Sequence, residues 1–251
     1  VEPLAQAGGT GVRSAAEAGT GADVLVLMVV NAAQAEAILF ADGALAALPE
    51  NGVVVLMATC PPGAVERLAA RVTEAGRRFV DAPVSGGVVG AQAATLTIMV
   101  AAPQATLDAV RPVLDALGDK VFQVGEKPGQ GAMVKTVNQL LCGVHIAVVA
   151  EAFALAAKVG VDLKILSGSS ASSWMLKDRG PRMLQADPPV TSAVDIFVKD
   201  LGIVLEAGRD VKAALPLAAL AHQMFLAVSG QGGGADDDSQ VIRAYQALNA
   251  P

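Results

Sequence analysis

Continuous apolar runs alternate with stretches of helical periodicity along the first half of this 251-residue chain. The apolar runs occupy residues 22–30, 52–59, 77–84, 94–102 and 120–125. Their richness in Val, Leu and Ile predicts strands, and the first run has the composition of a strand buried on both faces. The stretches at residues 31–40, 61–76 and 103–118 place apolar side chains at helical spacing. We therefore predict βα units around a mostly parallel sheet.

Start and stop signals agree with these helices. Asn31 is an expected N-cap, and the prolines at 61 and 62 with Gly76 show the asymmetry of a helix that starts with Pro and ends before Gly. The opening residues 1–9 resemble the end of a helix that Gly8 or Gly9 closes.

The pattern changes at Gly129. Residues 129–160 keep helical periodicity throughout, and no strand-like run follows them. The remaining helical segments are separated by turn-rich stretches such as SGSSASS and ADPPVTS. We infer an α/β domain over residues 1–128 and an all-helical domain over residues 129–251, entered by one long helix.

Composition excludes several classes of protein. The net charge is −6 and no basic run occurs, so a nucleic-acid surface is not expected. The most apolar stretch, residues 140–157, contains His145 and Glu151, which favours a buried helix over a membrane span. Two cysteines do not make a disulfide framework and no secretion signal is visible, so we expect a reducing cytoplasm.

Ligands of open α/β sheets bind at the carboxyl ends of the strands. Three loops fit that place, at residues 29–31, 58–61 and 83–87. In the third, Ser85 offers a hydroxyl, while Gly86 and Gly87 let the backbone approach an anion closely. A small carboxylate would suit this turn, although an ordinary Gly-rich turn has the same composition.

The long helix carries a second candidate group. Gly131, Lys135 and Asn138 share one helix face at i, i+4 and i+7. Lys135 stands among Met133, Val134 and Val137 in the sequence, and desolvation there would lower a lysine pKa toward neutrality, as an acid/base catalyst requires. A solvated lysine on an amphipathic helix is the alternative.

Other polar residues have simpler explanations. Lys199 and Asp200 suit a salt-bridged surface turn, and His145 and His222 suit packed positions in apolar helices. The carboxylates at residues 236–238 suit a loop and helix N-cap. Without a further acidic or Cys/His cluster, no metal site is expected.

Three ordered motifs resemble the β-hydroxyacid dehydrogenase family, which includes 3-hydroxyisobutyrate dehydrogenases and tartronate semialdehyde reductases. The motifs are DAPVSGG at residues 81–87, GAMVKTVN at 131–138 and FVKDLG at 197–202. Their order and spacing agree with the family along essentially the whole chain. Within it, the segments at residues 140–161, 172–179 and 192–202 look most like the members that act on L-threonate.

The resemblance implies a Rossmann-type parallel sheet domain followed by an all-α domain for substrate binding and oligomerisation. It implies Lys135 as the catalytic acid/base with Asn138 assisting, and a hydroxy acid whose carboxylate is bound by Ser85, Gly86 and Gly87. It also implies that NAD, or NADP, is bound by these residues: Val30, Asn31, Thr59 and Lys199.

One departure from the family stands out. The family begins with a strand–GxGxxG–helix–strand unit that binds pyrophosphate, and here this first unit is absent. The Gly8–Gly11 segment does not follow a strand and is not a substitute. The unit was cut, disordered or never present, and the residue that selects NAD over NADP would also lie there.

Several functions remain open at this point. The resemblance favours oxidation of a four-carbon polyhydroxy acid such as L-threonate, with 3-hydroxyisobutyrate dehydrogenase or tartronate semialdehyde reductase as alternatives. A non-catalytic binding or scaffold module is the alternative of another class. An imine reductase of this fold would not need Lys135. Apolar surplus at residues 129–160 and 215–228 predicts a homodimer or homotetramer.

Overall fold

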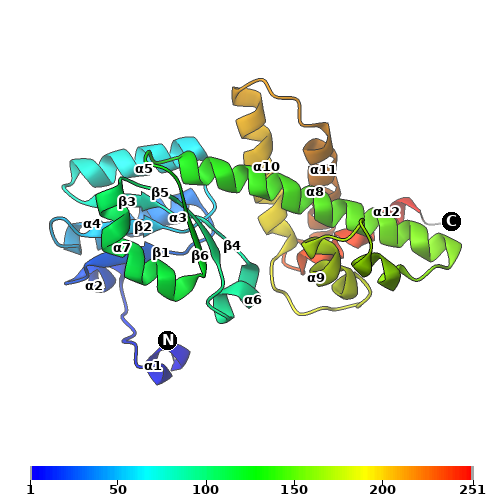
Figure 1. Cartoon of the computed structure of the whole chain (residues 1–251), viewed down its shortest axis with the longest axis horizontal. Coiled ribbons are helices and arrows are strands. Elements are labelled where there is room, and N and C mark those ends of the chain that lie inside the picture. The colour runs from blue at the N-terminus through cyan, green and yellow to red at the C-terminus, as the bar shows by residue number, and fades with distance from the viewer. Residues whose placement is uncertain (1, 250–251) are drawn as a thin grey trace. The chain divides into compact units, whose positions relative to one another are not determined.

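The computed structural model describes residues 2–249 and divides the chain into two compact units, Val1–Lys135 and Thr136–Pro251 (Figure 1). The first unit is built around a β-sheet and the second is helical. Buried apolar side chains form separate cores in the two units.

One six-stranded sheet forms the centre of the first unit. Its strands are β1 (Val24–Leu27), β2 (Val53–Leu56), β3 (Arg78–Asp81), β4 (Val84–Ser85), β5 (Thr97–Ala101) and β6 (Lys120–Gly125). β1, β2 and β3 are parallel neighbours, and their last residues, Leu27, Leu56 and Asp81, lie in one register row. Strands therefore form at all five predicted apolar runs, and three of them share a carboxyl edge.

The sheet is more mixed than the alternation of strands and helices predicts. Asp81 of β3 pairs with Ala101 of β5 in antiparallel fashion, and β4 is also antiparallel to β5, whereas β6 is parallel to β5. Besides the short strand β4, the connection from β3 to β5 contains the six-residue helix α6 (Gly87–Gln92). At 1.5 Å per residue α6 is about 9 Å long, which is shorter than the strand along which a parallel crossover would have to return.

The structure contradicts the prediction that the first strand is buried on both faces. Leu25 and Leu27 are buried, but Val26 is 36% and Met28 is 65% exposed. β1 lies at one end of the strand order, and its buried side chains join the cluster that also holds residues of α3 and α5. On the opposite face only Val24 packs partly against the other cluster, so the burial of β1 alternates as in a strand that is fully covered on one face only.

Helices pack on both faces of the sheet (Figure 1). Val54 and Leu56 of β2 point into one apolar cluster, while Val53 and Val55 point into another, as the two-residue period of a strand requires. The helices of this unit are α1 (Glu2–Gln6), α2 (Ala15–Gly19), α3 (Ala32–Glu36), η1 (Ala37–Ala41), α4 (Ala44–Ala47), α5 (Pro62–Glu74), α6 and α7 (Gln104–Leu117).

The predicted start and stop signals are confirmed. Asn31 is the N-cap of α3, where its side chain accepts a 2.9 Å hydrogen bond from the Gln34 N–H. Gly8 follows α1 at a φ of +85°, and Gly76 follows α5 at +76°, in the left-handed region that favours glycine. α2, α4 and α6 are too short to show a helical period and were not predicted.

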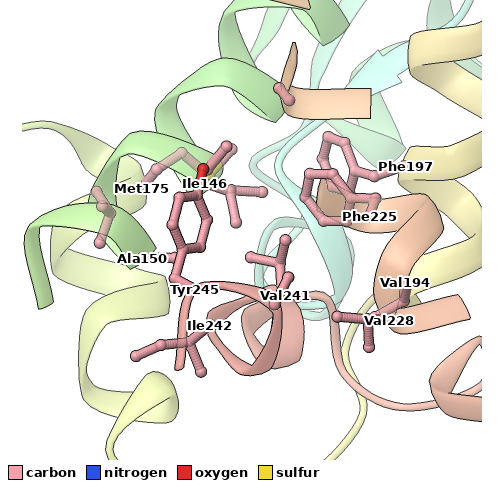
Figure 2. Close-up of a cluster of buried hydrophobic side chains, with 14 of the residues drawn as sticks. Ile146, Ala150, Met175, Val194, Phe197, Phe225, Val228, Val241, Ile242 and Tyr245 are labelled. Carbon is pink, nitrogen blue, oxygen red and sulfur yellow. The ribbon is translucent and has the colours of Figure 1, made fainter. Parts of the chain in front are cut away.

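The helical unit is organised around one long helix, α8 (Gln130–Val159), which begins in the first unit. The other elements are η2 (Leu163–Gly168), α9 (Trp174–Met183), α10 (Val194–Asp210), α11 (Pro216–Val228), η3 (Ser229–Gly233), η4 (Asp238–Val241) and α12 (Ile242–Leu248). Figure 2 shows the core that these elements enclose, in which the Phe197 and Phe225 rings stack with centroids 5.2 Å apart.

By length and composition alone, α8 could cross a membrane. Its residues Ile146 and Ala150 instead lie in the core of the helical unit (Figure 2), which is the packing expected of a core helix. His222 is partly buried, with Nε2 3.0 Å from the Val198 carbonyl oxygen, as predicted. The prediction that His145 is packed is wrong, because its position on α8 leaves it exposed.

A buried ion-pair network joins α9 to η4. Arg179 donates from Nε and Nη2 to the two oxygens of Asp238 at 2.8 Å each, and Arg182 Nη1 donates to Asp237 Oδ2 at 2.8 Å. Asp237 also caps η4 by accepting from the Ser239 N–H, so the predicted N-cap is confirmed. Burial raises the pKa of the Asp238 carboxyl, and Arg179 opposes that effect. The Arg179–Asp238 pair was not predicted.

Candidate active site

The predicted cofactor loops leave the sheet at one edge. Val30 and Thr59 each stand three residues beyond the row formed by Leu27 and Leu56, which are the ends of β1 and β2. Because β1, β2 and β3 are parallel neighbours, the segment after Asp81 leaves at the same edge. The structure therefore brings the Val30–Asn31 turn, Thr59 and the start of the 82–87 segment to the carboxyl edge predicted for a ligand.

The first of these loops is held by reciprocal hydrogen bonds. The Gln34 side chain accepts from the Val30 N–H at 2.9 Å, while the Gln34 N–H donates to Asn31 Oδ1. Val30 is 47% exposed and Thr59 is partly buried. An apolar side chain followed by an amide, with a hydroxyl beyond the neighbouring strand, suits a nicotinamide dinucleotide, which has apolar ring faces, an amide and ribose hydroxyls. The residue types at this edge therefore fit the expected cofactor.

The turn at Ser85 depends on its two glycines. Ser85 belongs to β4 and pairs with Thr97 of β5. Gly86 has a φ of +133° and Gly87 a φ of +61°, conformations that side chains other than glycine disfavour. A Cβ built on Gly87 would meet no atom within 4 Å. The backbone there borders open space, which a small anion can approach. The same openness occurs at Gly76 and Gly160, so it is compatible both with a carboxylate site and with an ordinary Gly-rich turn.

Asp81 lies four residues before Ser85 and binds the start of α8. Its Oδ2 accepts hydrogen bonds from the Gly129 N–H at 2.9 Å and the Ala132 N–H at 3.0 Å. Burial raises the pKa of the Asp81 carboxyl to about 6, and backbone N–H groups of Ala132, Gly129 and Gly131 oppose this rise. The sequence motif contained Asp81, but its contact with α8 was not predicted.

Near Lys135, the charged residue of α8 is buried and the neighbouring apolar residues are exposed. Lys135 is buried, with 7% exposed, whereas Met133, Val134 and Val137 are 39%, 38% and 55% exposed. The prediction that these three neighbours desolvate Lys135 is wrong, because helical geometry places them on other faces. Lys135 shares its face with Gly131, where a Cβ would lie only 2.7 Å from the Met99 carbonyl oxygen. Lys135 is therefore not a solvated lysine.

In the helical unit, two predicted site residues belong to one hydrogen-bond chain. Asn138 Nδ2 donates to Gln139 Oε1 at 2.9 Å, and Gln139 Nε2 donates to Asp200 Oδ2 at 2.5 Å. Lys199 Nζ donates to Asp200 Oδ1 at 2.5 Å. Asp200 is 2% exposed, so the Lys199–Asp200 pair is not the surface salt bridge that was the alternative. Sequence reasoning did not single out Gln139.

Two hollows in the described part of the chain lie elsewhere. One is on α5 beside Glu66 and Thr73, and the other is in the helical unit beside Phe153 and Met183. Neither is lined by a predicted site residue. Among residues 2–249, no group of three or more His, Cys, Asp or Glu side chains could hold a metal ion. The candidate site is therefore defined by the residues at the carboxyl edge of the sheet and not by either of these two hollows.

The chain matches two family models that together cover most of its length. The NAD binding domain of 6-phosphogluconate dehydrogenase matches residues 1–125. The NAD-binding domain of NADP-dependent 3-hydroxyisobutyrate dehydrogenase matches residues 129–245.

Proteins similar to this chain along most of its length include two L-threonate dehydrogenases. An L-threonate dehydrogenase from Cupriavidus necator is 44% identical over 100% of this chain and 86% of the relative. One from Pectobacterium atrosepticum is 41% identical over 91% of this chain and 77% of the relative. A crystal structure of 3-hydroxyisobutyrate dehydrogenase from Salmonella typhimurium has a TM-score of 0.91 and 38% identity, covering 96% of this chain and 86% of that one.

Proposed function

This chain belongs to the β-hydroxyacid dehydrogenase family, in its 3-hydroxyisobutyrate dehydrogenase-like group, and from that premise we propose that it oxidises a four-carbon polyhydroxy acid such as L-threonate. It is an NAD(P)-dependent hydroxyacid oxidoreductase, which sets aside the alternative of a non-catalytic module. The substrate and the roles of individual residues are the parts that we propose.

We propose Lys135 as the group that exchanges the hydroxyl proton. The observation that carries this proposal is the burial of Lys135 on the α8 face that starts at Gly131. The backbone at Gly131 packs against Asp81, the residue that precedes the Ser85 turn. When the acid is oxidised, the hydroxyl proton passes to Lys135 Nζ and the carbinol carbon loses a hydride. The nicotinamide supplies the acceptor for that hydride when the cofactor is bound.

The substrate carboxylate is assigned to Ser85, Gly86 and Gly87. Gly87 borders open space and both glycines adopt backbone conformations that a larger residue would disfavour, so N–H groups and the Ser85 hydroxyl can approach an anion. Asn138, one helical turn beyond Lys135, is assigned to a substrate oxygen. Val30, Asn31 and Thr59 are assigned to the cofactor at the sheet edge, and Lys199 to the cofactor from the helical unit.

L-Threonate ranks first among substrates for two reasons. The two relatives described above are L-threonate dehydrogenases with similarity along nearly the whole chain. Ser172 Oγ, like Ser239 Oγ, is also buried without a hydrogen-bond partner among the described residues, and we assign Ser172 to an additional substrate hydroxyl, which would suit it better than a methyl branch. 3-Hydroxyisobutyrate is the second candidate, because the Salmonella structure bears that name.

A substrate panel tests this assignment. The full-length protein is assayed with L-threonate, 3-hydroxyisobutyrate, glycerate and tartronate semialdehyde, each with NAD(H) and NADP(H), and with the matching neutral alcohols. We expect L-threonate to give the highest kcat/KM. Each lost charge-assisted hydrogen bond costs about 1.5–3 kcal/mol, so neutral alcohols should turn over at least about tenfold more slowly. Faster oxidation of 3-hydroxyisobutyrate would reverse the ranking, and equal turnover of the neutral alcohols would remove the carboxylate site.

We also propose a homodimer or homotetramer that forms through the helical unit. Leu141, Val148 and Leu155 of α8 are 52%, 53% and 65% exposed and repeat every seven residues, while Leu217 and Leu220 of α11 are 66% and 57% exposed. Exposed apolar rows of this kind mark protein interfaces. Light scattering at micromolar concentration should give a mass above that of one chain, and Val148→Glu should reduce it. A monomeric wild-type protein would contradict this proposal.

The cytoplasm is the proposed location. The two cysteines, Cys60 and Cys142, are not joined in a disulfide, and one is buried while the other is partly buried. Reduced thiols are stable in a reducing compartment. Fractionation of cells that express the full-length protein, with detection by antibody, tests the location directly.

A further inference from the structure

The start of α8 lacks a capping side chain of its own. The Gly129 carbonyl accepts from the Met133 N–H at 2.9 Å, which makes Gly129 the N-cap residue, and glycine has no side-chain acceptor. The first turn of a helix has N–H groups without intrahelical partners. Ser, Thr, Asp and Asn are the preferred N-cap residues because their side chains can accept from one of these N–H groups.

Asp81 supplies the missing acceptor from another element. Its Oδ2 binds the N–H of Gly129 and that of Ala132, the third helical residue, over 48 and 51 positions in the sequence. The carboxylate is 1% exposed. A side chain at the end of β3 therefore performs the capping that the helix's own N-cap residue cannot.

Close packing holds the same turn from a second direction. A Cβ on Gly131 would lie 2.7 Å from the Met99 carbonyl oxygen and 3.0 Å from Asp81 Cγ. The backbone of α8 thus approaches β3 and β5 as closely as glycine allows. Hydrogen bonds along the helix axis and backbone contact across it together fix the position and the rotation of the first turn.

This arrangement links the proposed acid/base residue to the proposed carboxylate site. Lys135 lies four residues beyond Gly131 on the same helix face, and Ser85 of β4 lies four residues beyond Asp81, the last residue of β3. We infer that Asp81 is a positioning residue for the reaction, which fixes the first turn of α8 and thereby places Lys135 relative to the Ser85–Gly87 turn. The inference rests on the proposed role of Lys135.

If Asp81 is a positioning residue, position 81 needs a side chain whose length brings an acceptor oxygen to the two N–H groups, and it does not need a negative charge. Both N–H groups bind the same oxygen, Oδ2, and an amide oxygen can take that place. Asp81→Asn keeps the reach and removes the charge, whereas Asp81→Glu keeps the charge and lengthens the side chain. A direct acid/base role for Asp81 would have the opposite requirement.

Steady-state kinetics of full-length variants separates these possibilities. We expect Asp81→Asn to keep kcat for the hydroxy acid within about fivefold of wild type, and Asp81→Glu and Asp81→Ala to lower it about 10- to 100-fold, as small misplacements of a catalytic group do. The cofactor KM should change little in all three. An Asp81→Glu variant as active as Asp81→Asn, or more active, would overturn the inference, and this comparison holds even where Asp81→Ala does not fold.

Amide hydrogen exchange gives a readout that needs neither cofactor nor turnover. In Asp81→Ala the amides of residues 129–135 should exchange at least about tenfold faster, with β1 and β2 unchanged. Val110→Ala, which removes a fully buried side chain of α7 in the same unit, is the control for general loss of stability. Unchanged exchange at residues 129–135, or an equal fall of kcat in Val110→Ala at equal stability, would overturn the inference.

A different result would contradict the proposed role of Lys135. If Lys135→Ala retains turnover, then Lys135 is not the acid/base residue. The exchange experiment would still report whether Asp81 holds the start of α8.

Discussion

Gln139 of α8 and Asp200 of α10 are joined by a 2.5 Å hydrogen bond from Nε2 to Oδ2, between side chains that are 6% and 2% exposed. The same two residues hold Asn138 and Lys199, because Asn138 donates to Gln139 and Lys199 donates to Asp200. Asn138, proposed to bind substrate, and Lys199, proposed to bind cofactor, are thus oriented by Gln139 and Asp200. Neither Gln139 nor Asp200 has a proposed contact with a ligand.

Gln139→Glu should break this pair. The substitution places two carboxylates together in a buried site, so we expect the free energy of unfolding at pH 7 to fall by about 2–5 kcal/mol. One carboxyl of the pair would take up a proton more readily in the folded state than in the unfolded state. The loss should therefore shrink as the pH is lowered toward 5, which chemical denaturation at several pH values would measure.

Gln104→Glu is the matched control. Gln104 Nε2 donates to Asp108 Oδ1 at 2.7 Å in an exposed position on α7. The same substitution there should change stability by no more than about 0.5 kcal/mol, because water screens the two charges. Equal losses of unfolding free energy in the two variants would show that the buried Gln139–Asp200 pair does not contribute to stability.

Lys135→Ala in the full-length protein should abolish oxidation of the hydroxy acid. Loss of a general acid/base lowers the rate by about 10²–10⁴-fold, while cofactor affinity, measured by titration, should change little. Lys135→Arg keeps a positive charge but cannot release its proton at neutral pH, so it should be nearly as inactive. Near-normal turnover in either variant would remove Lys135 from the chemistry.

Gly131→Ala should destabilise the first unit. A Cβ there would collide with the Met99 carbonyl oxygen at 2.7 Å, and overpacking of this kind costs about 1–3 kcal/mol. Gly63 is also the second residue of its helix, α5, but the nearest atom to a Cβ there is Arg67 Nη1 at 3.6 Å. Gly63→Ala should therefore be neutral or stabilise by up to about 1 kcal/mol. Thermal unfolding of both variants tests the difference, and a harmless Gly131→Ala would contradict the close approach.

Stability should depend on pH through Asp81. Its pKa is about 6 in the folded chain against 3.8 for the free side chain, so the folded state binds the proton more tightly. The resulting stabilisation is complete below about pH 3.8 and is lost as the pH rises through about 6. Relative to Asp81→Asn, the wild type should lose up to about 3 kcal/mol of unfolding free energy between about pH 4 and pH 6.

Urea unfolding of both proteins at pH 4, 5, 6 and 7 measures this difference. The pKa of Asp237 is lowered by its hydrogen bonds and Arg182, although burial opposes this. The contribution of Asp237 is therefore lost only as the pH falls below about 3.8, outside this window. Parallel pH profiles for the wild type and Asp81→Asn would contradict the raised pKa.

The sequence alone determined the features that depend on neighbours a few residues apart. Apolar runs and helical spacing predicted strands at all five runs and α8 from Gln130 to Val159 within a residue at each end. The Asn31 cap is confirmed for the same reason. The motif around Ser85 and the spacing of Lys135 and Asn138 were also readable, because a helix turn or a Gly-rich turn is encoded locally.

Tertiary structure decided everything that depends on which distant segments meet. Asp81 binds an N–H 48 residues away, and Gln139 binds a carboxylate 61 residues away; no local pattern specifies such partners. The antiparallel placement of β5 and the exposure of His145 were likewise invisible. Lys135 is buried while more apolar neighbours are exposed. The burial of a helix face depends on the surface against which the helix packs, and the hydropathy of the helix residues does not specify that surface.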